Sequence, residues 1–198
     1  MKKFGIVSSF DEFCGNATYA EVLANGLKSK CEEDDEIIKL SLNQEILRKV
    51  VFSYEAKKHI NDLCKEASKC EGINIHFEFG LYGPNVKFQT WAIKKLIRSS
   101  KKCVITIHRL ENPSKFPSFS LKYLLKPLDY INQLKIYYAS SPYWHAFISI
   151  IRLAKRHGAE FVSHHNLCTK RMIGRPYHIR KENIITYPIT FFNKKEQD

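Results

Sequence analysis

The chain has 198 residues, enough for one sizeable domain, and its 44% hydrophobic and 26% charged residues are typical of a globular protein. No apolar run reaches the length of a membrane span, and Lys2 and Lys3 precede only a short strand rather than the core of a signal peptide. The net charge of +12 predicts an acidic partner: nucleic acid, an anionic membrane surface or a phosphate-bearing substrate.

Strand and helix signals alternate along the first half of the chain. A short apolar run predicts a strand over 3–8, and apolar residues at helical spacing, from Ala20 to Leu27, predict a helix over 17–30. The same patterns predict a strand over 36–42, one or two helices between 43 and 70, a strand over 72–79, a helix over 86–97 and a strand over 101–108.

The second half is less regular. Two prolines predict a loop over 109–119, residues 120–131 fit a helix interrupted at Pro127, and the pattern of 133–140 fits a strand or a helix equally. The elements expected after these are a helix over 143–158 that ends at Gly158, a strand over 159–165, a short helix over 167–174 and a last strand over 183–189.

Strands that alternate with helices predict an α/β fold, a Rossmann-like and mostly parallel sheet with helices on both faces. We expect residues 1–190 to form this single lobe and 191–198 to be a tail or the start of a linker. Ligands of such sheets lie beyond the carboxyl ends of the strands. The segments 14–15, 76–83 and 108–111 are therefore expected along one rim.

The first rim loop contains Cys14, Gly15 and Asn16, directly before a helix. A glycine here allows a ligand to approach the backbone closely, and the helix N-terminus attracts anions. On this stretch alone, a glycine that only permits a tight turn is the more common explanation.

The other two rim loops carry polar side chains. Glu78, Tyr82 and Asn85 follow the third strand, where Glu78 fits either a sugar-binding or proton-accepting role or a cap or ion pair. His108 directly follows the fourth strand. A histidine at this place can donate a hydrogen bond to a sugar or phosphate oxygen, or transfer a proton. A partly buried histidine that is hydrogen-bonded to nearby backbone explains the residue equally well.

Cysteines and histidines do not predict a metal centre. His164, His165 and Cys168 are close in sequence, but adjacent histidines point in different directions and a fourth ligand is not evident. The six cysteines form no CxxC pair, so we expect reduced thiols and a cytoplasmic protein.

Basic residues gather in three groups, and the middle one is interleaved with aromatic and aliphatic residues over 116–125. The groups are Lys94, Lys95, Arg98, Lys101 and Lys102; Lys115, Lys122 and Lys126; and the basic residues from Lys170 to Lys181. This pattern fits either a peripheral contact with the inner face of an anionic membrane or a solvated surface.

The order of these motifs resembles the N-terminal lobe of GT-B glycosyltransferases, especially the retaining family 4. The similar segments are CGNATYAEVLANGL at 14–27, INIHFEFGLYG at 73–83, CVITIH at 103–108, and AEFVSHHNLCTKRMI at 159–173 followed by ENIITYPI at 182–189. They cover nearly the whole chain, although the glycine that often follows the last proline is missing.

The resemblance implies the acceptor-binding lobe of a retaining glycosyltransferase, whose substrates are a nucleotide-sugar and a glycan or lipid-linked acceptor. It places Cys14, Gly15 and Asn16 near the donor phosphates, His108 at the transferring sugar as the catalytic-site residue, and Glu78, Tyr82, Arg109 and Glu111 on the acceptor side. It implies no cofactor besides the donor substrate.

The family's donor-binding lobe is expected beyond Asp198, so this chain by itself is expected to be inactive. An isolated lobe, a half that pairs with a separate donor-binding chain and a truncated enzyme all fit. Two other classes stay open: a non-catalytic sugar-binding or interaction module, and a nucleic-acid-binding protein. Nucleic acid ranks last because the charge is scattered over several elements and a recognised binding module does not occur.

Overall fold

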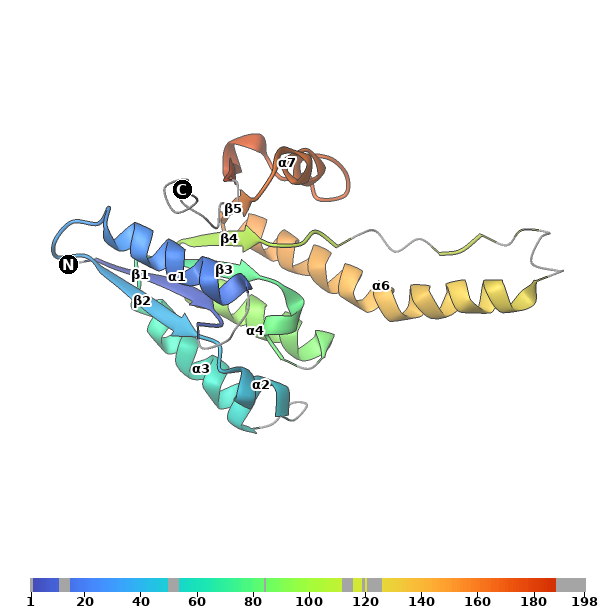
Figure 1. Ribbon diagram of the computed structural model, residues 1–198, viewed down its shortest axis with the longest axis horizontal. Helices are drawn as coiled ribbons and strands as arrows, with labels where there is room; N and C mark the ends of the chain where they lie inside the picture. The colour runs from blue at the N-terminus through green and yellow to red at the C-terminus, as the bar shows by residue number, and fades with distance from the viewer. Residues whose placement is uncertain are drawn as a thin grey trace, which may run out of the picture.

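A computed structural model describes residues 2–10, 15–49, 54–83, 85–111, 116–118, 120 and 126–187. Six strands form one all-parallel sheet in the order β2-β1-β3-β4-β5-β6 (Figure 1). The strands are β1 (Lys3–Ser8), β2 (Glu36–Ser41), β3 (Gly72–Phe77), β4 (Cys103–Ile107), β5 (Glu160–Ser163) and β6 (Ile184–Thr186). The predicted Rossmann-like α/β fold is confirmed.

The connections between the strands are helical. The helices are α1 (Gly15–Lys28), α2 (Gln44–Lys49), α3 (Tyr54–Ser68), η1 (Phe79–Leu81), α4 (Val86–Ser99), α6 (Pro127–Arg156), α7 (Asn166–Ile173) and η2 (Lys181–Asn183). Helix α1 connects β1 to β2 in one direction along the sheet, and α3 and α4 connect strands in the opposite direction. Because parallel crossovers are right-handed, α1 lies on one face of the sheet and α3 and α4 lie on the other. Helix α4 packs between α3 and α6.

The strand order reverses between β1 and β3. From β1 the chain moves to β2 on one side, and β3 and all later strands lie on the other side. In open parallel sheets the crevice at such a reversal is the usual ligand site, because the loops that leave the two strands separate there. The loops after β1 and β3 are the first two that the sequence placed on the rim.

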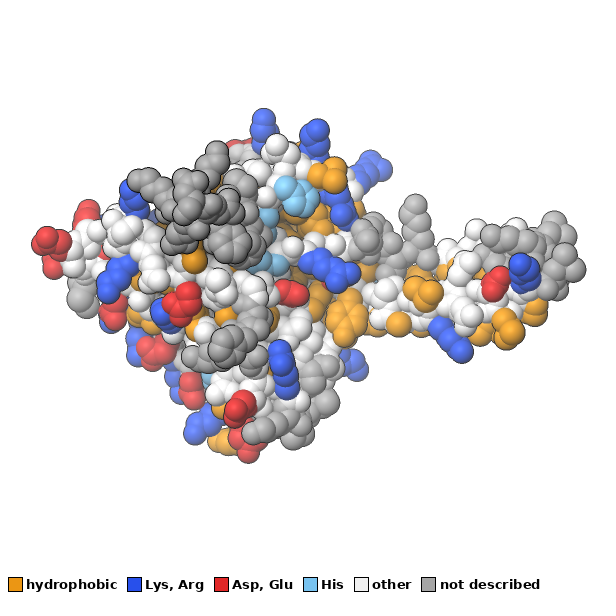
Figure 2. Space-filling view, viewed as in Figure 1, with side chains coloured by type: hydrophobic (Ala, Val, Ile, Leu, Met, Phe, Trp, Pro, Cys, Tyr) orange, Lys and Arg blue, Asp and Glu red, His pale blue; other side chains and the backbone are white. Residues whose placement is uncertain are grey.

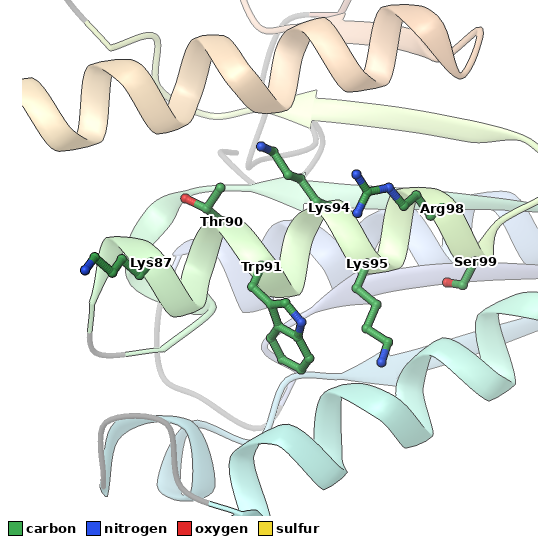
Figure 3. A pocket seen from close by; sticks show the side chains of 7 residues that line it. All are labelled: Lys87, Thr90, Trp91, Lys94, Lys95, Arg98 and Ser99. Carbon is green, nitrogen blue, oxygen red and sulfur yellow. The ribbon is translucent and has the colours of Figure 1, made fainter.

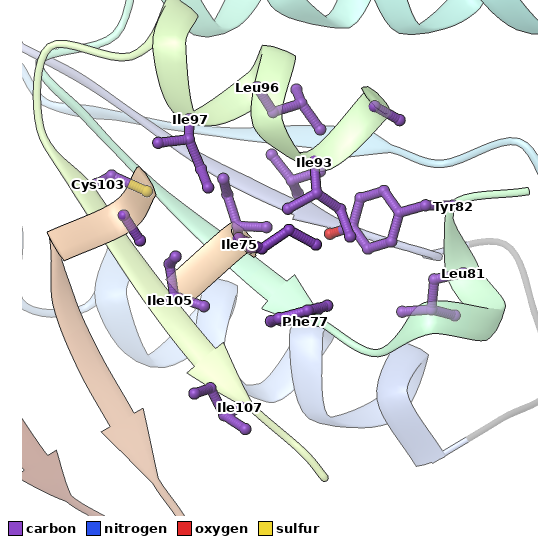
Figure 4. Packing of buried hydrophobic residues seen from close by; sticks show 14 of the residues in the cluster. Ile75, Phe77, Leu81, Tyr82, Ile93, Leu96, Ile97, Cys103, Ile105 and Ile107 are labelled. Carbon is purple, nitrogen blue, oxygen red and sulfur yellow. The ribbon is translucent and has the colours of Figure 1, made fainter. Parts of the chain in front are cut away.

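The main core lies between the sheet and the α3–α4–α6 layer (Figure 4). Strands β3 and β4 contribute odd-numbered residues to it, and the register aligns Ile75 with Ile105 and Phe77 with Ile107. Alternate residues of a strand point to opposite faces, so the even-numbered His76 and Thr106 face the α1 side. There Thr106 Oγ1 lies 2.9 Å from Asn74 Oδ1, a polar pair on the inner sheet surface.

The ambiguous segment 133–140 is helical and belongs to the 30-residue α6. Proline fits the first helical position, because the missing N–H has no partner there, and α6 begins at Pro127. The helix continues through Pro142 and ends near Gly158, whose φ of +75° suits a helix terminus. None of the helices among the described residues is long and apolar enough to cross a membrane.

Candidate functional site

The carboxyl ends of β1, β3, β4 and β5 meet at one edge of the sheet, beside the N-terminus of α1. Gly15 is the first residue of α1. A Cβ atom at this position would meet none of the described atoms within 4 Å, and its φ is not in the left-handed region. Neither packing nor backbone strain among the described residues explains this glycine. Cys14 lies outside the described residues.

The loop after β3 is held rigidly by buried hydrogen bonds. The Tyr82 hydroxyl donates to the His76 carbonyl over 2.7 Å, and Gln44 Nε2 donates to the Leu81 carbonyl over 2.8 Å. Gln89 Nε2 donates to the Gly83 carbonyl, and the Asn85 side chain accepts from the Phe88 N–H as the N-cap of α4. These contacts fix the backbone that carries Glu78.

Tyr82, expected on the acceptor side of the rim, lies in the core instead. Its side chain is fully buried, and its ring packs beside Ile93 on the α4 side of the sheet (Figure 4). Burial raises the pKa of its hydroxyl well above the usual value, so the phenol stays neutral. Tyr82 therefore supports the rim loop from below and does not line the rim.

Glu78 connects two of the predicted rim loops. Asn16 Nδ2, on the first turn of α1, donates a hydrogen bond to Glu78 Oε2. This contact joins the α1 N-terminus to the end of β3, across the point where the strand order reverses. The sequence assigned Asn16 to the donor side and Glu78 to the acceptor side, and the structure brings both into contact.

Three of the predicted acceptor-side residues share one cavity of about 130 Å³. Glu78, Arg109 and Glu111 line it together with residues of η1, β3 and α6: Phe77, Phe79, Gly80, Tyr143 and Phe147. The Tyr177 hydroxyl donates to the Glu111 carbonyl and holds this segment against the body. The cavity thus combines two carboxylates and one guanidinium with an aromatic wall.

His108 belongs to a cluster of rings on the α1 side of the sheet. Its ring centroid lies 5.1 Å from that of His76 and 5.0 Å from that of His164. Tyr19 of α1 covers all three histidines, with centroid distances of 5.3 Å to His76, 5.5 Å to His108 and 5.2 Å to His164. On the face that Figure 2 shows, some histidine side chains are visible at the surface of the body beside basic residues.

All three imidazoles are neutral at physiological pH. Burial, together with His108 and His164, lowers the pKa of His76 to about 3, and burial with His164 lowers the pKa of His108 to about 4. Burial also lowers the pKa of His164, although its hydrogen bond to the Tyr187 carbonyl acts in the opposite direction and raises it. Burial raises the pKa of Tyr19. The cluster therefore presents uncharged hydrogen-bonding groups.

Several of these nitrogens have no hydrogen-bond partner among the described residues. They are both ring nitrogens of His76, whose side chain is completely buried, and Nε2 of His108 and of His164. Buried polar atoms are normally paired, because an unpaired donor or acceptor loses its hydration without compensation. These nitrogens come from the ends of three neighbouring strands, β3, β4 and β5, and lie beside the first turns of α1.

Sequence reasoning did not assign roles to His76, His164 and Tyr19. His76 was within the rim segment, and its position in the strand, between core-facing Ile75 and Phe77, was the signal that placed it on the other face. His164 was considered only with His165 and Cys168. Its neighbour His165 instead caps α7, with Nδ1 accepting from the Cys168 N–H over 3.0 Å. No group of three His, Cys, Asp or Glu side chains in the described ranges is arranged to hold a metal ion.

Three residues of the first basic group, Lys94, Lys95 and Arg98, lie away from this edge on the outer surface of α4 (Figure 3). They line an open hollow together with Lys87, Thr90, Trp91 and Ser99. Lys95 Nζ lies 5.3 Å from the Trp91 ring centroid and donates to Asn61, and partial burial beside Arg98 lowers the pKa of Lys94. Lys101 is instead paired with Glu71 over 2.7 Å.

No protein-family model matches the chain, and no curated protein is significantly similar to it. Function must therefore be inferred from the fold and from the geometry of the carboxyl edge. Two features of that edge decide which ligands fit: an accessible helix N-terminus on one side and an uncharged histidine cluster on the other.

Proposed function

We propose that the chain is the acceptor-binding lobe of a retaining GT-B glycosyltransferase, which moves a sugar from a nucleoside diphosphate to a glycan or lipid-linked acceptor. The observation that carries the proposal is the neutral His76–His108–His164 cluster beside the N-terminus of α1. The donor diphosphate, the transferred sugar and the acceptor each match the chemistry of one part of this edge.

The N-terminus of α1 suits the donor diphosphate. The helix has 14 residues, long enough for aligned peptide dipoles, and its first N–H groups have no helical partner. Gly15 leaves room for phosphate oxygens to approach these groups, in a place where its own packing does not require a glycine. In the complete enzyme this positive end would favour the negative charge that develops on the leaving diphosphate.

The histidine cluster suits the sugar. A neutral imidazole offers one donor and one acceptor, which matches a sugar hydroxyl. Because the pKa of His108 is about 4, its imidazole is a poor general base at neutral pH, and a hydrogen bond to the transferring sugar is the role that fits. The role proposed for His108 is therefore binding of the transferring sugar and not proton transfer.

The cavity lined by Glu78, Arg109 and Glu111 suits an acceptor with hydroxyl groups. Carboxylates accept hydrogen bonds from hydroxyls, and the aromatic walls from η1 and α6 can lie against the apolar face of a sugar ring. The contact between Glu78 and Asn16 places this cavity next to the donor side. Donor and acceptor would then meet where the strand order reverses.

Transfer by the protein purified from its source, with any chain that copurifies, tests the proposal. A panel of radiolabelled nucleoside diphosphate sugars would be incubated with the protein and a lipid and glycan extract of the same source. We expect one donor to be used, and His108→Ala to lower transfer at least about a hundredfold, as loss of a hydrogen bond in a transition state does. The exposed His145 on α6 supplies the matched control, His145→Ala, which should retain transfer.

Two results would contradict the proposal. Undiminished transfer in a folded His108→Ala variant would remove this histidine from the site. Binding of free glycans without transfer from any donor would indicate a sugar-binding module instead. An intact mass about twice that of this chain would show that a second lobe of similar size belongs to the native protein.

A further inference from the structure

Helix α6 extends far beyond the body of the molecule (Figure 1). With 30 residues it is about 45 Å long, at a rise of about 1.5 Å per residue. Its C-terminal half is anchored in the core through Phe147, Ile148, Ile150, Ile151 and Ala154. The N-terminal half, Pro127 to Pro142, has no buried residue. We call this half, together with the described residues 116–118, the arm.

The arm carries a concentration of exposed hydrophobic side chains. Six of the 13 large hydrophobic residues that are exposed in the described part of the chain lie on the arm or at its base. Leu128 is 72% exposed and Ile136 is 68% exposed, among the highest values of the large hydrophobic residues in the described part of the chain. The six are Phe116, Leu128, Ile131, Ile136, Tyr138 and Tyr143. Figure 2 shows hydrophobic side chains along the arm, with few charged groups between them.

One side of the arm helix is already covered by its own chain. The Phe116 ring lies 5.2 Å from that of Tyr137, and the Tyr130 hydroxyl donates to the Pro117 carbonyl over 3.4 Å. On a different side, Leu128, Ile131 and Tyr138 follow the spacing i, i+3 and i+10, which puts them on one stripe. This stripe stays open to solvent among the described residues.

Lysines accompany the apolar stripe. Lys135 falls on the stripe itself, one turn after Ile131, and Lys126 directly precedes the helix. Over 115–142 the sequence contains four lysines and one acidic residue, Asp129, and the whole chain carries +12. Long lysine side chains can keep their ammonium groups in the headgroup layer while their stems lie along apolar surface.

We propose that the arm docks on the surface of a bilayer that contains anionic phospholipid. Aliphatic and aromatic residues on one stripe, with Lys135 on it and Lys126 beside it, are typical of a helix that lies in the membrane interface. A second copy of the chain is the less suitable occupant, because two arms of like charge repel each other. Nucleic acid would match the lysines but not Leu128, Ile131 and Ile136.

The position of the arm also narrows the acceptor class, an extension that rests on the proposed function. Tyr143 and Phe147, at the base of the arm, line the cavity that contains Glu78 and Arg109. A docked arm would therefore hold the carboxyl edge of the sheet next to the bilayer. Of the two acceptor classes that fit the cavity, a lipid-linked acceptor is the one that this arrangement presents.

Sedimentation with vesicles tests the docking without reference to transfer. The purified protein would be mixed with vesicles of phosphatidylcholine alone or of phosphatidylcholine and phosphatidylglycerol. We expect the unchanged protein to bind the anionic vesicles. The double variant Leu128→Ser with Ile131→Ser should bind them at least about tenfold more weakly. Lys126→Glu with Lys135→Glu should lower it by a similar factor, because each lysine near an anionic surface adds attraction.

Matched controls on α1 and the turn that follows it separate the effect of the arm from that of the general charge. Val22→Ser with Leu27→Ser changes two other exposed apolar residues, and Lys28→Glu with Lys30→Glu makes the same change in charge. Equal loss of binding in the control and arm variants, or absence of binding by the unchanged protein, would overturn the proposal. So would self-association that only the arm variants abolish. If the protein binds the vesicles but transfers no sugar, the docking proposal holds and only the proposed enzymatic function is refuted.

Discussion

At the scale of single residues, His76 is the side chain whose burial is hardest to explain by stability. Neither of its ring nitrogens is hydrogen-bonded to a described residue, although the side chain is completely buried. Each unpaired buried polar atom costs about 1–3 kcal/mol, and an apolar residue of similar size would avoid this cost. A residue kept in a place where it destabilises the fold is expected to serve a ligand.

His76→Leu should therefore separate stability from binding. We expect the free energy of unfolding at neutral pH to rise by about 2–6 kcal/mol, because two unpaired nitrogens are removed and each costs about 1–3 kcal/mol. Binding of the sugar donor identified by the transfer assay should fall at least about tenfold in the same variant, since its hydrogen bonds to the imidazole are lost. Urea unfolding and calorimetric titration measure the two quantities. Lower stability with unchanged donor binding would make His76 a structural residue.

The residues of the site were accessible to sequence reasoning to different degrees. His108 could be placed because it directly follows an unmistakable buried strand, and Glu78 because it ends the neighbouring one. Tyr82 could not, since its loop position suggested the rim while tertiary packing turned its ring into the core. The partnership of His108 with His164 depends on β5 lying next to β4, which local patterns do not specify.

At the scale of elements, the turn between β3 and α4 determines how the rim loop is held. Gly83 has a φ of +126°, which side chains other than glycine rarely adopt. A Cβ there would lie 2.7 Å from Phe88 Cδ1, inside the first turn of α4. The turn, its cap at Asn85 and the first ring of α4 thus fit together only with a glycine at this position.

Gly83→Ala should destabilise the fold by at least about 2 kcal/mol, because backbone strain and the contact with Phe88 add to each other. Gly26→Ala is the matched control: Gly26 is helical, a Cβ there meets no described atom within 4 Å, and the change should stabilise by up to about 1 kcal/mol. Chemical denaturation of both variants measures the effects. Equal stabilities would show that the turn relaxes without cost.

The elements themselves were predictable where burial imposes a period, and less so elsewhere. The strands β1 and β4 follow short apolar runs, as expected in a parallel sheet that is covered on both faces, whereas β3 alternates apolar with polar residues. The segment 133–140 fitted two structures, since the arm exposes apolar residues on more than one side and so lacks a single buried stripe. Its helical state follows from continuity with the anchored half of α6.

At the scale of the whole molecule, the buried histidines link stability to pH. The ordinary pKa of histidine is about 6.5, and in the folded chain the pKa of His76 is about 3 and that of His108 about 4. Between these values and 6.5 the unfolded chain binds more protons than the folded one, so the free energy of unfolding must fall as the pH falls. Above about pH 7 both states are neutral at these positions, and this contribution vanishes.

We therefore expect the protein to lose stability on acidification well before its carboxylates are protonated. From about pH 7.5 to about pH 5, His76 and His108 should each lower the free energy of unfolding by about 2 kcal/mol. Urea titrations at the two pH values measure the difference, and His76→Leu should reduce it by about 2 kcal/mol because this group no longer titrates. A stability independent of pH over this range would mean that the imidazoles can accept protons in the folded state. The cluster would then attract phosphate by charge, and the hydrogen-bonding role of His108 toward an uncharged sugar would have to be abandoned.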